Sequence, residues 1–181
     1  MSKKRALVTG VTGQDGAYLS SLLLSEGYEV YGGMRRSSTD SSWRLKELGV
    51  WNRIKPVSLE MLEYSNIYET IKQIQPDEIY NLAAQSFVRA SFDQPIYTSE
   101  ATALGPLKIL ETIKTINPEI KFYQASSSEM YGLVQEPIQN EDTKFYPRSP
   151  YAVAKTYAHY MTVNYRESYN IFGCCGILFN H

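Results

Sequence analysis

The chain has 181 residues, of which 43% are hydrophobic and 20% are charged, and its formal net charge is −1. This composition predicts one globular domain over residues 1–181, and the near-zero charge argues against nucleic acid or an anionic membrane as a partner. No apolar run approaches the roughly 20 residues that cross a bilayer. The basic start Met1–Arg5 is followed by only three apolar residues, so we expect no signal peptide and a cytoplasmic protein.

Apolar runs alternate with helical patterns along the chain. We expect strands at residues 5–8, 28–31, 54–57, 78–82, 121–125 and 174–179, and helices at 17–26, 44–48, 67–74, 96–116 and 150–168. Gly27 is the expected end of the first helix. Strands that alternate with helices imply right-handed crossovers, so the predicted fold class is α/β, a doubly wound parallel sheet of the Rossmann type.

Glycines recur between the first strand and the first helix, at Gly10, Gly13 and Gly16. A backbone without Cβ atoms turns tightly and approaches a ligand closely, and the following helix N-terminus suits a pyrophosphate. The spacing GxxGxxG is a variant of the dinucleotide fingerprint. A plain strand–helix turn also favours glycine, but the strand before and the helix after this segment favour nucleotide binding.

The end of the second strand distinguishes the two nicotinamide cofactors. It carries Arg35, Arg36 and Ser37, and no acidic residue occurs after Glu29 until Asp40. Guanidinium groups and a hydroxyl suit a 2′-phosphate, whereas NAD sites usually place a carboxylate on the ribose. The alternative is a solvated basic loop. Given the glycine motif upstream, we predict NADP.

A phenol and an ammonium lie four residues apart at Tyr151 and Lys155, hence on one helix face. Ser149 is a good N-cap, which places Tyr151 in the first turn, and a nearby lysine is expected to lower the pKa of the phenol. With fifteen tyrosines a YxxxK match is expected by chance. The serine-rich segment 125–129, which leaves the fifth strand, supports this pair as the catalytic one.

The two cysteines, Cys174 and Cys175, are adjacent in an apolar run and lack the spacing of metal or redox sites. We expect small buried residues here and predict no metal site. His159, one turn beyond Lys155, is expected to pack against its neighbours.

Longer segments carry a family resemblance. They are TGVTGQDGAYL at 9–19, RRSS at 35–38, YNLAAQSFV at 80–88, FYQASSSEMYG at 122–132, FYPRSPYAVAK at 145–155 and GILFNH at 176–181. Together they resemble the extended short-chain dehydrogenase/reductases that act on nucleotide sugars, and within these the GDP-mannose 4,6-dehydratase family. The resemblance covers about the first half of such an enzyme. It implies that a C-terminal substrate domain is absent from this chain, that the substrate is GDP-mannose and that the full-length protein is a homo-oligomer, a dimer or a tetramer.

The resemblance also implies catalytic roles. Tyr151 would take the C4-hydroxyl proton, Glu129 would remove the C5 proton and help the C6 hydroxyl leave, Ser127 would bind the C4 oxygen, and Lys155 would hold the cofactor ribose. Glu129 separates dehydratases from epimerases, which usually carry a small or apolar residue there. A 4-keto reductase or epimerase, and a catalytically silent NADP sensor, are the alternatives.

The implied cofactor contacts are Gly10, Thr12, Gly13, Gln14, Asp15, Gly16, Arg35, Arg36, Ser37, Glu60, Met61, Leu82, Ala83, Ala84, Tyr151 and Lys155. The implied substrate contacts are Gln85, Ser86, Ser127, Glu129, Tyr151 and Asn180. The chain departs from the family at Ser127, usually Thr, and at Glu60, usually Asp. It also carries Thr102 where the family has Asp or Asn, which leaves the polar bonding of that helix open.

Overall fold

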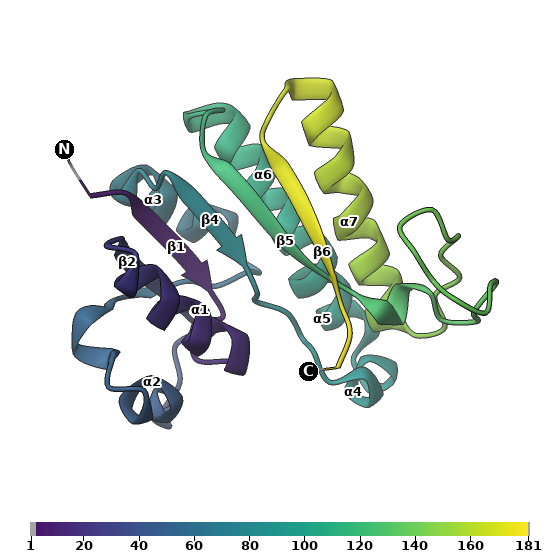
Figure 1. Cartoon of the computed structure of the whole chain (residues 1–181), viewed down its shortest axis with the longest axis horizontal. Helices are drawn as coiled ribbons and strands as arrows, with labels where there is room; N and C mark the ends of the chain where they lie inside the picture. The colour runs from purple at the N-terminus through teal and green to yellow at the C-terminus, as the bar shows by residue number, and fades with distance from the viewer. Residues whose placement is uncertain (1–2, 181) are drawn as a thin grey trace.

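The computed structural model describes residues 3–180, and a six-stranded parallel sheet forms its centre. The strands are β1 (Arg5–Thr9), β2 (Glu29–Met34), β3 (Lys55–Ser58), β4 (Glu78–Asn81), β5 (Lys121–Ser127) and β6 (Gly173–Leu178). Their order across the sheet is β3-β2-β1-β4-β5-β6. The predicted doubly wound α/β fold is therefore confirmed (Figure 1).

Helices cover both faces of this sheet. They are α1 (Gln14–Ser25), α2 (Trp43–Glu47), α3 (Tyr64–Ile74), α4 (Val88–Asp93), α5 (Pro95–Ser99), α6 (Gly105–Ile116) and α7 (Pro150–Tyr169), with short turns η1 (Trp51–Arg53) and η3 (Ser128–Met130) and a π-helical segment η2 (Glu100–Leu104). None of the helices within residues 3–180 is long and apolar enough to cross a membrane.

Side chains of β1 alternate between two cores, as the two-residue period of a strand requires. Leu7 packs with apolar residues of α3 and α6, such as Ile71 and Ile109. Ala6 and Val8 pack on the other face with residues of α1 and α2. A strand buried on both faces reads as a continuous apolar run, which is what residues 6–8 are.

The predicted helix over residues 96–116 is three consecutive pieces in the structure, α5, η2 and α6. The π-helical turn places Ala101 against the cavity described below and directs Thr102 to the backbone N–H of Gln85. α4 is not predicted from the sequence pattern, because a helix of six residues is too short to establish an apolar period. Gly27 does end the first helix region, with a φ of +86° that favours glycine.

The carboxyl ends of the strands lie along one edge of the sheet, where α4 and the end of β6 are also found (Figure 1). The strand order changes direction between β1 and β4, because β2 follows β1 on one side and β4 lies on the other. Open α/β sheets bind ligands in the crevice at such a switch point. The fold therefore presents a ligand crevice between the loops that follow β1 and β4.

Candidate active site

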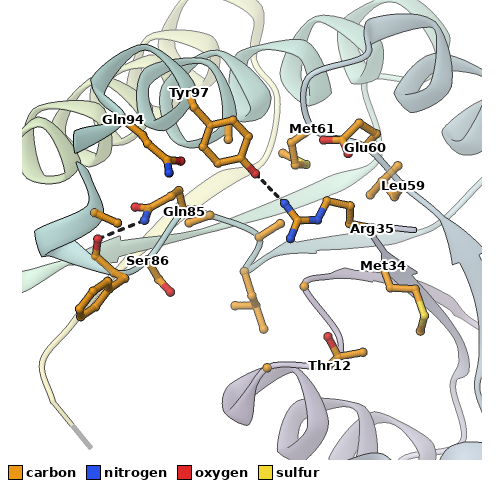
Figure 2. A pocket seen from close by; sticks show the side chains of 18 residues that line it. Thr12, Met34, Arg35, Leu59, Glu60, Met61, Gln85, Ser86, Gln94 and Tyr97 are labelled. Atoms are coloured by element: carbon orange, nitrogen blue, oxygen red, sulfur yellow. Dashed lines mark hydrogen bonds between the residues drawn. The ribbon is translucent and has the colours of Figure 1, made fainter. Parts of the chain in front are cut away.

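A cavity of about 630 Å³ occupies this crevice. Its wall is formed by the loop after β1, the ends of β2 and β3, the segment after β4, and residues of α5 and η2 (Figure 2). Eleven predicted contacts line it: Gly10, Thr12, Gly13, Arg35, Glu60, Met61, Leu82, Ala83, Ala84, Gln85 and Ser86. The structure thus brings the glycine motif, the basic strand end and the NLAAQS segment to one cavity.

Close backbone packing explains two of the glycines. Gly10 has a φ of +67°, and a Cβ atom there would lie 3.0 Å from the backbone nitrogen of Ala83. A Cβ on Gly16 would lie 2.5 Å from the carbonyl oxygen of Gly10. Glycine at these positions lets the β1 loop approach both the β4 segment and the start of α1. The N-cap of α1 is Gly13, so the positive end of the helix dipole borders the cavity.

Arg35 extends from the end of β2 across the cavity and donates a 2.8 Å hydrogen bond to the hydroxyl oxygen of Tyr97 on α5 (Figure 2). The sequence analysis missed Tyr97, together with Phe87 and Gln94, which also line the cavity. No motif marks these residues.

The side chains of the β4 segment leave one acceptor without a partner. The Gln85 amide donates to the carbonyl oxygen of Phe87 at 3.1 Å, and its Oε1 atom is buried with no hydrogen-bond partner within residues 3–180. A buried acceptor of this kind is costly unless a donor completes it. The hydroxyl of Thr102 accepts the Gln85 backbone N–H at 3.1 Å. Thr102, which stands where the family has Asp or Asn, therefore still makes a polar bond.

The predicted catalytic residues gather at the carboxyl end of β5 and the start of α7. Ser149 caps α7 as predicted, since its hydroxyl accepts the Ala152 N–H at 3.0 Å. Tyr151 follows in the first turn. The Ser127 hydroxyl accepts the backbone N–H of Glu129 at 3.2 Å, which fixes the backbone of Glu129 at the end of the strand. β4 and β5 are paired up to Asn81 and Gln124, so the segments that follow them are neighbours.

The predicted lowering of the Tyr151 pKa by Lys155 is wrong for this structure. Burial raises the pKa of Tyr151, a hydrogen bond with Ser127 lowers it, and the charge of Glu129 raises it again. Lys155 does not offset the burial, because its ammonium donates to the Ala125 carbonyl oxygen at 2.6 Å and lies 5.7 Å from the centre of the Tyr151 ring. Burial also lowers the pKa of Lys155, to about 8.

His159 packs as predicted, edge-on to Phe145 and Tyr160, and its Nδ1 atom lies 3.1 Å from the Ser126 hydroxyl. Burial lowers the pKa of His159, and the Arg166 charge adds to this effect. Sequence reasoning gave no reason to pair Ser126 with this histidine.

Other predicted residues lie outside the cavity wall. They are Gln14, Asp15, Gly16, Arg36, Ser37, Ser127, Glu129, Tyr151, Lys155 and Asn180. Asn180 is exposed just after β6, and Arg36 and Ser37 are exposed after β2. Within residues 3–180 no group of three or more His, Cys, Asp or Glu is arranged to hold a metal ion.

The expectation of two buried cysteines is wrong for Cys174, which is exposed, whereas Cys175 is partly buried. Cys175 faces α7, where its sulfur lies 3.8 Å from the His159 carbonyl oxygen. Alternation along β6 turns Cys174 to the opposite face, beside Tyr80 and Tyr123.

Solved nucleotide-sugar enzymes share the fold. UDP-glucose 4-epimerase from Brucella ovis, solved in complex with NAD, aligns with a TM-score of 0.85 at 21% identity, over 98% of this chain and 52% of that one. DesIV, a dTDP-glucose 4,6-dehydratase from Streptomyces venezuelae solved with NAD, aligns with a TM-score of 0.82 at 21% identity, over 94% of this chain and 54% of that one.

Sequence relatives are closer. The chain is 52% identical to GDP-mannose 4,6-dehydratase of Vibrio cholerae serotype O1, over 100% of this chain and 50% of the relative. It is 47% identical to the Homo sapiens GDP-mannose 4,6 dehydratase, over 100% of this chain and 51% of the relative. The chain therefore spans about half the length of these relatives. The family model for GDP-mannose 4,6 dehydratase matches residues 7–181. With that match over nearly its whole length, the chain belongs to the GDP-mannose 4,6-dehydratase family.

Proposed function

We propose that this chain is the cofactor-binding and catalytic half of an NADP-dependent lyase that removes water from GDP-mannose to give GDP-4-keto-6-deoxymannose. The observation that carries the proposal is the grouping of Ser127, Glu129 and Tyr151 at the carboxyl end of β5 and the start of α7. The Ser127 hydroxyl accepts the Glu129 N–H at 3.2 Å, and Ser127 and Glu129 both influence the pKa of Tyr151. A base for an alcohol and a separate carboxylate are the two groups that such a dehydration requires.

The residues present fit a dinucleotide. Gly10 and Gly13 leave the cavity floor as bare backbone next to the N-terminus of α1, which suits a pyrophosphate. The unpartnered Oε1 atom of Gln85 is an acceptor for a ligand donor. Arg35, held across the cavity by Tyr97, offers the fork geometry that a 2′-phosphate accepts, and this favours NADP over NAD.

Each catalytic side chain has one task in the proposed reaction. Tyr151 takes the C4-hydroxyl proton while Ser127 binds the C4 oxygen. A nicotinamide bound in the cavity would supply the redox chemistry, as the acceptor of the C4 hydride and its donor to C6. The C4 ketone acidifies the C5–H bond, and Glu129 removes that proton and passes it to the C6 hydroxyl, which leaves as water. Once C6 has received the hydride, the proton that Tyr151 took from the C4 hydroxyl goes to C5. Lys155, one turn after Tyr151 on α7, holds the ribose.

An internal hydride transfer is the test of this reaction. GDP-mannose deuterated at C4 is incubated with trace NADP and the chain, both alone and joined to the C-terminal half of the Vibrio cholerae relative. Deuterium at C6 of a 4-keto product is the expected result. Three other outcomes would each overturn the dehydratase. C4 epimerisation without loss of water would support an epimerase. Deuterium in the NADPH pool would support a reductase, and unchanged substrate with NADP bound would support a sensor.

We further propose a homo-oligomer that associates through α5 and α7. These helices pack together and expose apolar side chains, with Ile96 73%, Val153 55% and Tyr160 56% exposed. Apolar patches of this kind mark association surfaces. Two cysteines without a disulfide are consistent with a reducing compartment, and we propose the cytoplasm.

A further inference from the structure

A chain of buried polar side chains runs beneath the cavity, from β1 through β4 to β5, which lie side by side in the sheet (Figure 1). The Thr9 hydroxyl donates to Asn81 Oδ1 at 2.7 Å, and the Asn81 amide donates to Gln124 Oε1 at 2.8 Å. The Gln124 amide in turn donates to the carbonyl oxygen of Ala125 at 3.0 Å. All three side chains are at most 1% exposed. The reaction proposed above assigns no task to Gln124.

The donor-to-acceptor direction of these hydrogen bonds is fixed at Thr9. The Thr9 hydroxyl oxygen accepts the backbone N–H groups of Leu82 and Ala83, each at 3.1 Å. Its single proton is therefore left for Asn81. An amide has one acceptor end and one donor end. Asn81 must turn its NH₂ group to Gln124, and Gln124 must turn its own NH₂ group to Ala125.

This series of hydrogen bonds ends on the Ala125 carbonyl oxygen, which also accepts a hydrogen bond from Lys155. Ala125 lies just beyond Asn81↔Gln124, the last paired position of β4 and β5, and its carbonyl oxygen accepts both the Gln124 amide and the Lys155 ammonium. A carbonyl oxygen has two lone pairs, so each donor occupies one side. The buried ammonium is thereby confined to the side that faces α7.

We propose that Gln124 is a positioning residue that acts on Lys155 through the Ala125 carbonyl. Its NH₂ group blocks one side of this oxygen and sets the positive end of an amide dipole beside the ammonium. The position of Lys155, and the ease with which it loses its proton, then depend on a side chain that touches neither cofactor nor substrate. The functional importance of this control rests on the proposed function, but the contact itself does not.

The test follows Lys155 directly. The chain is labelled with ε-¹³C lysine and titrated by NMR, with Lys155→Arg identifying the resonance. Gln124→Glu keeps the acceptor for Asn81 and replaces the amide dipole with a carboxylate. We expect it to raise the pKa of Lys155 by about one unit or more, since an opposite charge within hydrogen-bonding range has effects of this size. Gln135→Glu adds the same charge at an exposed site and should leave the Lys155 titration unchanged.

An unchanged Lys155 titration in folded Gln124→Glu overturns the proposal. If that variant does not fold, the Lys155 titration is measured in Gln124→Met instead. Removal of the amide dipole should also raise the pKa of Lys155, and an unchanged pKa in this variant overturns the proposal. In the joined enzyme, the pH profile of kcat should move with the Lys155 pKa while the KM for GDP-mannose stays the same. If the Lys155 titration shifts as expected but the joined enzyme has no dehydratase activity, the proposed function is refuted and the inference about Gln124 stands.

Discussion

At the scale of single residues, Tyr151 is the sharpest test of the chemistry. Removal of its hydroxyl in Tyr151→Phe leaves the ring, which is only 8% exposed, in place. We expect turnover in the joined enzyme to fall by about 10²–10⁴-fold, the usual contribution of a general acid or base. NADP affinity, measured by calorimetry, should change little. Equal turnover by the two proteins would show that the phenol is not the base.

Arg35 controls the choice of cofactor in our proposal. Arg35→Ala removes a charged donor, and such hydrogen bonds contribute about 1.5–3 kcal/mol. We expect NADP affinity to fall about tenfold to a hundredfold and NAD affinity to stay nearly constant, as measured by calorimetry on the chain. Tyr97→Phe is the matched variant, because it removes only the 2.8 Å hydrogen bond that holds Arg35, and its effect should be smaller. A similar loss for both cofactors would refute 2′-phosphate recognition.

His159 should make stability depend on pH. Burial lowers its pKa below the usual 6.5, so the unfolded chain binds this proton more readily than the folded chain. The contribution of the neutral His159 imidazole to the free energy of unfolding is complete above pH ~6.5. It is lost as the pH falls through that value toward the lower pKa of the folded state. His159→Phe, which keeps a ring against Phe145, should make the urea midpoint less dependent on pH between pH 7 and pH 5. Parallel pH curves for the two proteins would contradict the assignment.

Residues with a motif could be identified from the sequence, and residues without one could not. Gly10 and Arg35 follow strands in a recognisable pattern, and both line the cavity. Tyr97 reaches the same cavity only because α5 folds back over the β4 segment, and that placement is a tertiary effect. The pKa of Tyr151 failed as a prediction for a related reason. Spacing on a helix places Lys155 nearby, but it does not reveal that the Ala125 carbonyl engages the ammonium.

At the scale of elements, the packing of α1 on the β1 loop depends on Gly16. A Cβ there would approach the Gly10 carbonyl oxygen to 2.5 Å and Val11 Cα to 2.7 Å, and both atoms belong to the backbone. We expect Gly16→Ala to destabilise the chain by about 1–3 kcal/mol, as overpacking does. Ser25→Ala, on the exposed end of the same helix, should change stability by less than about 0.5 kcal/mol. Urea unfolding measures both, and equal values would contradict the packing argument.

Elements with a strong apolar period were predictable, and local interruptions were not. Residues 150–168 were assigned to one helix, and α7 ends one residue later. Residues 96–116 were also assigned to one helix, but the period does not reveal the π-helical turn of η2. Thr102 of that turn accepts a tertiary hydrogen bond from the Gln85 N–H, which a local pattern cannot contain.

At the scale of the whole molecule, the exposed α5–α7 surface predicts self-association. Tyr157 and Val153 lie one turn apart on α7 and are 39% and 55% exposed. Val153→Glu places a charge in that surface, and we expect light scattering to detect a shift toward monomer. Leu22→Glu, on the exposed face of α1, is the control and should keep the assembly state. A monomeric wild-type chain at every concentration tested would refute this surface.

The cavity wall includes Gly10, Gly13 and the 82–84 segment, whereas the side chain proposed to recognise one cofactor is that of Arg35, which donates a hydrogen bond to Tyr97. Arg35 is exposed, and neither side chain belongs to the apolar clusters that hold the sheet together. In our proposal, coenzyme preference and folding therefore depend on different residues. If the proposed cofactor site is correct, a few substitutions at Arg35 and its neighbours would exchange NADP for NAD, and the sheet and its apolar clusters would stay unchanged.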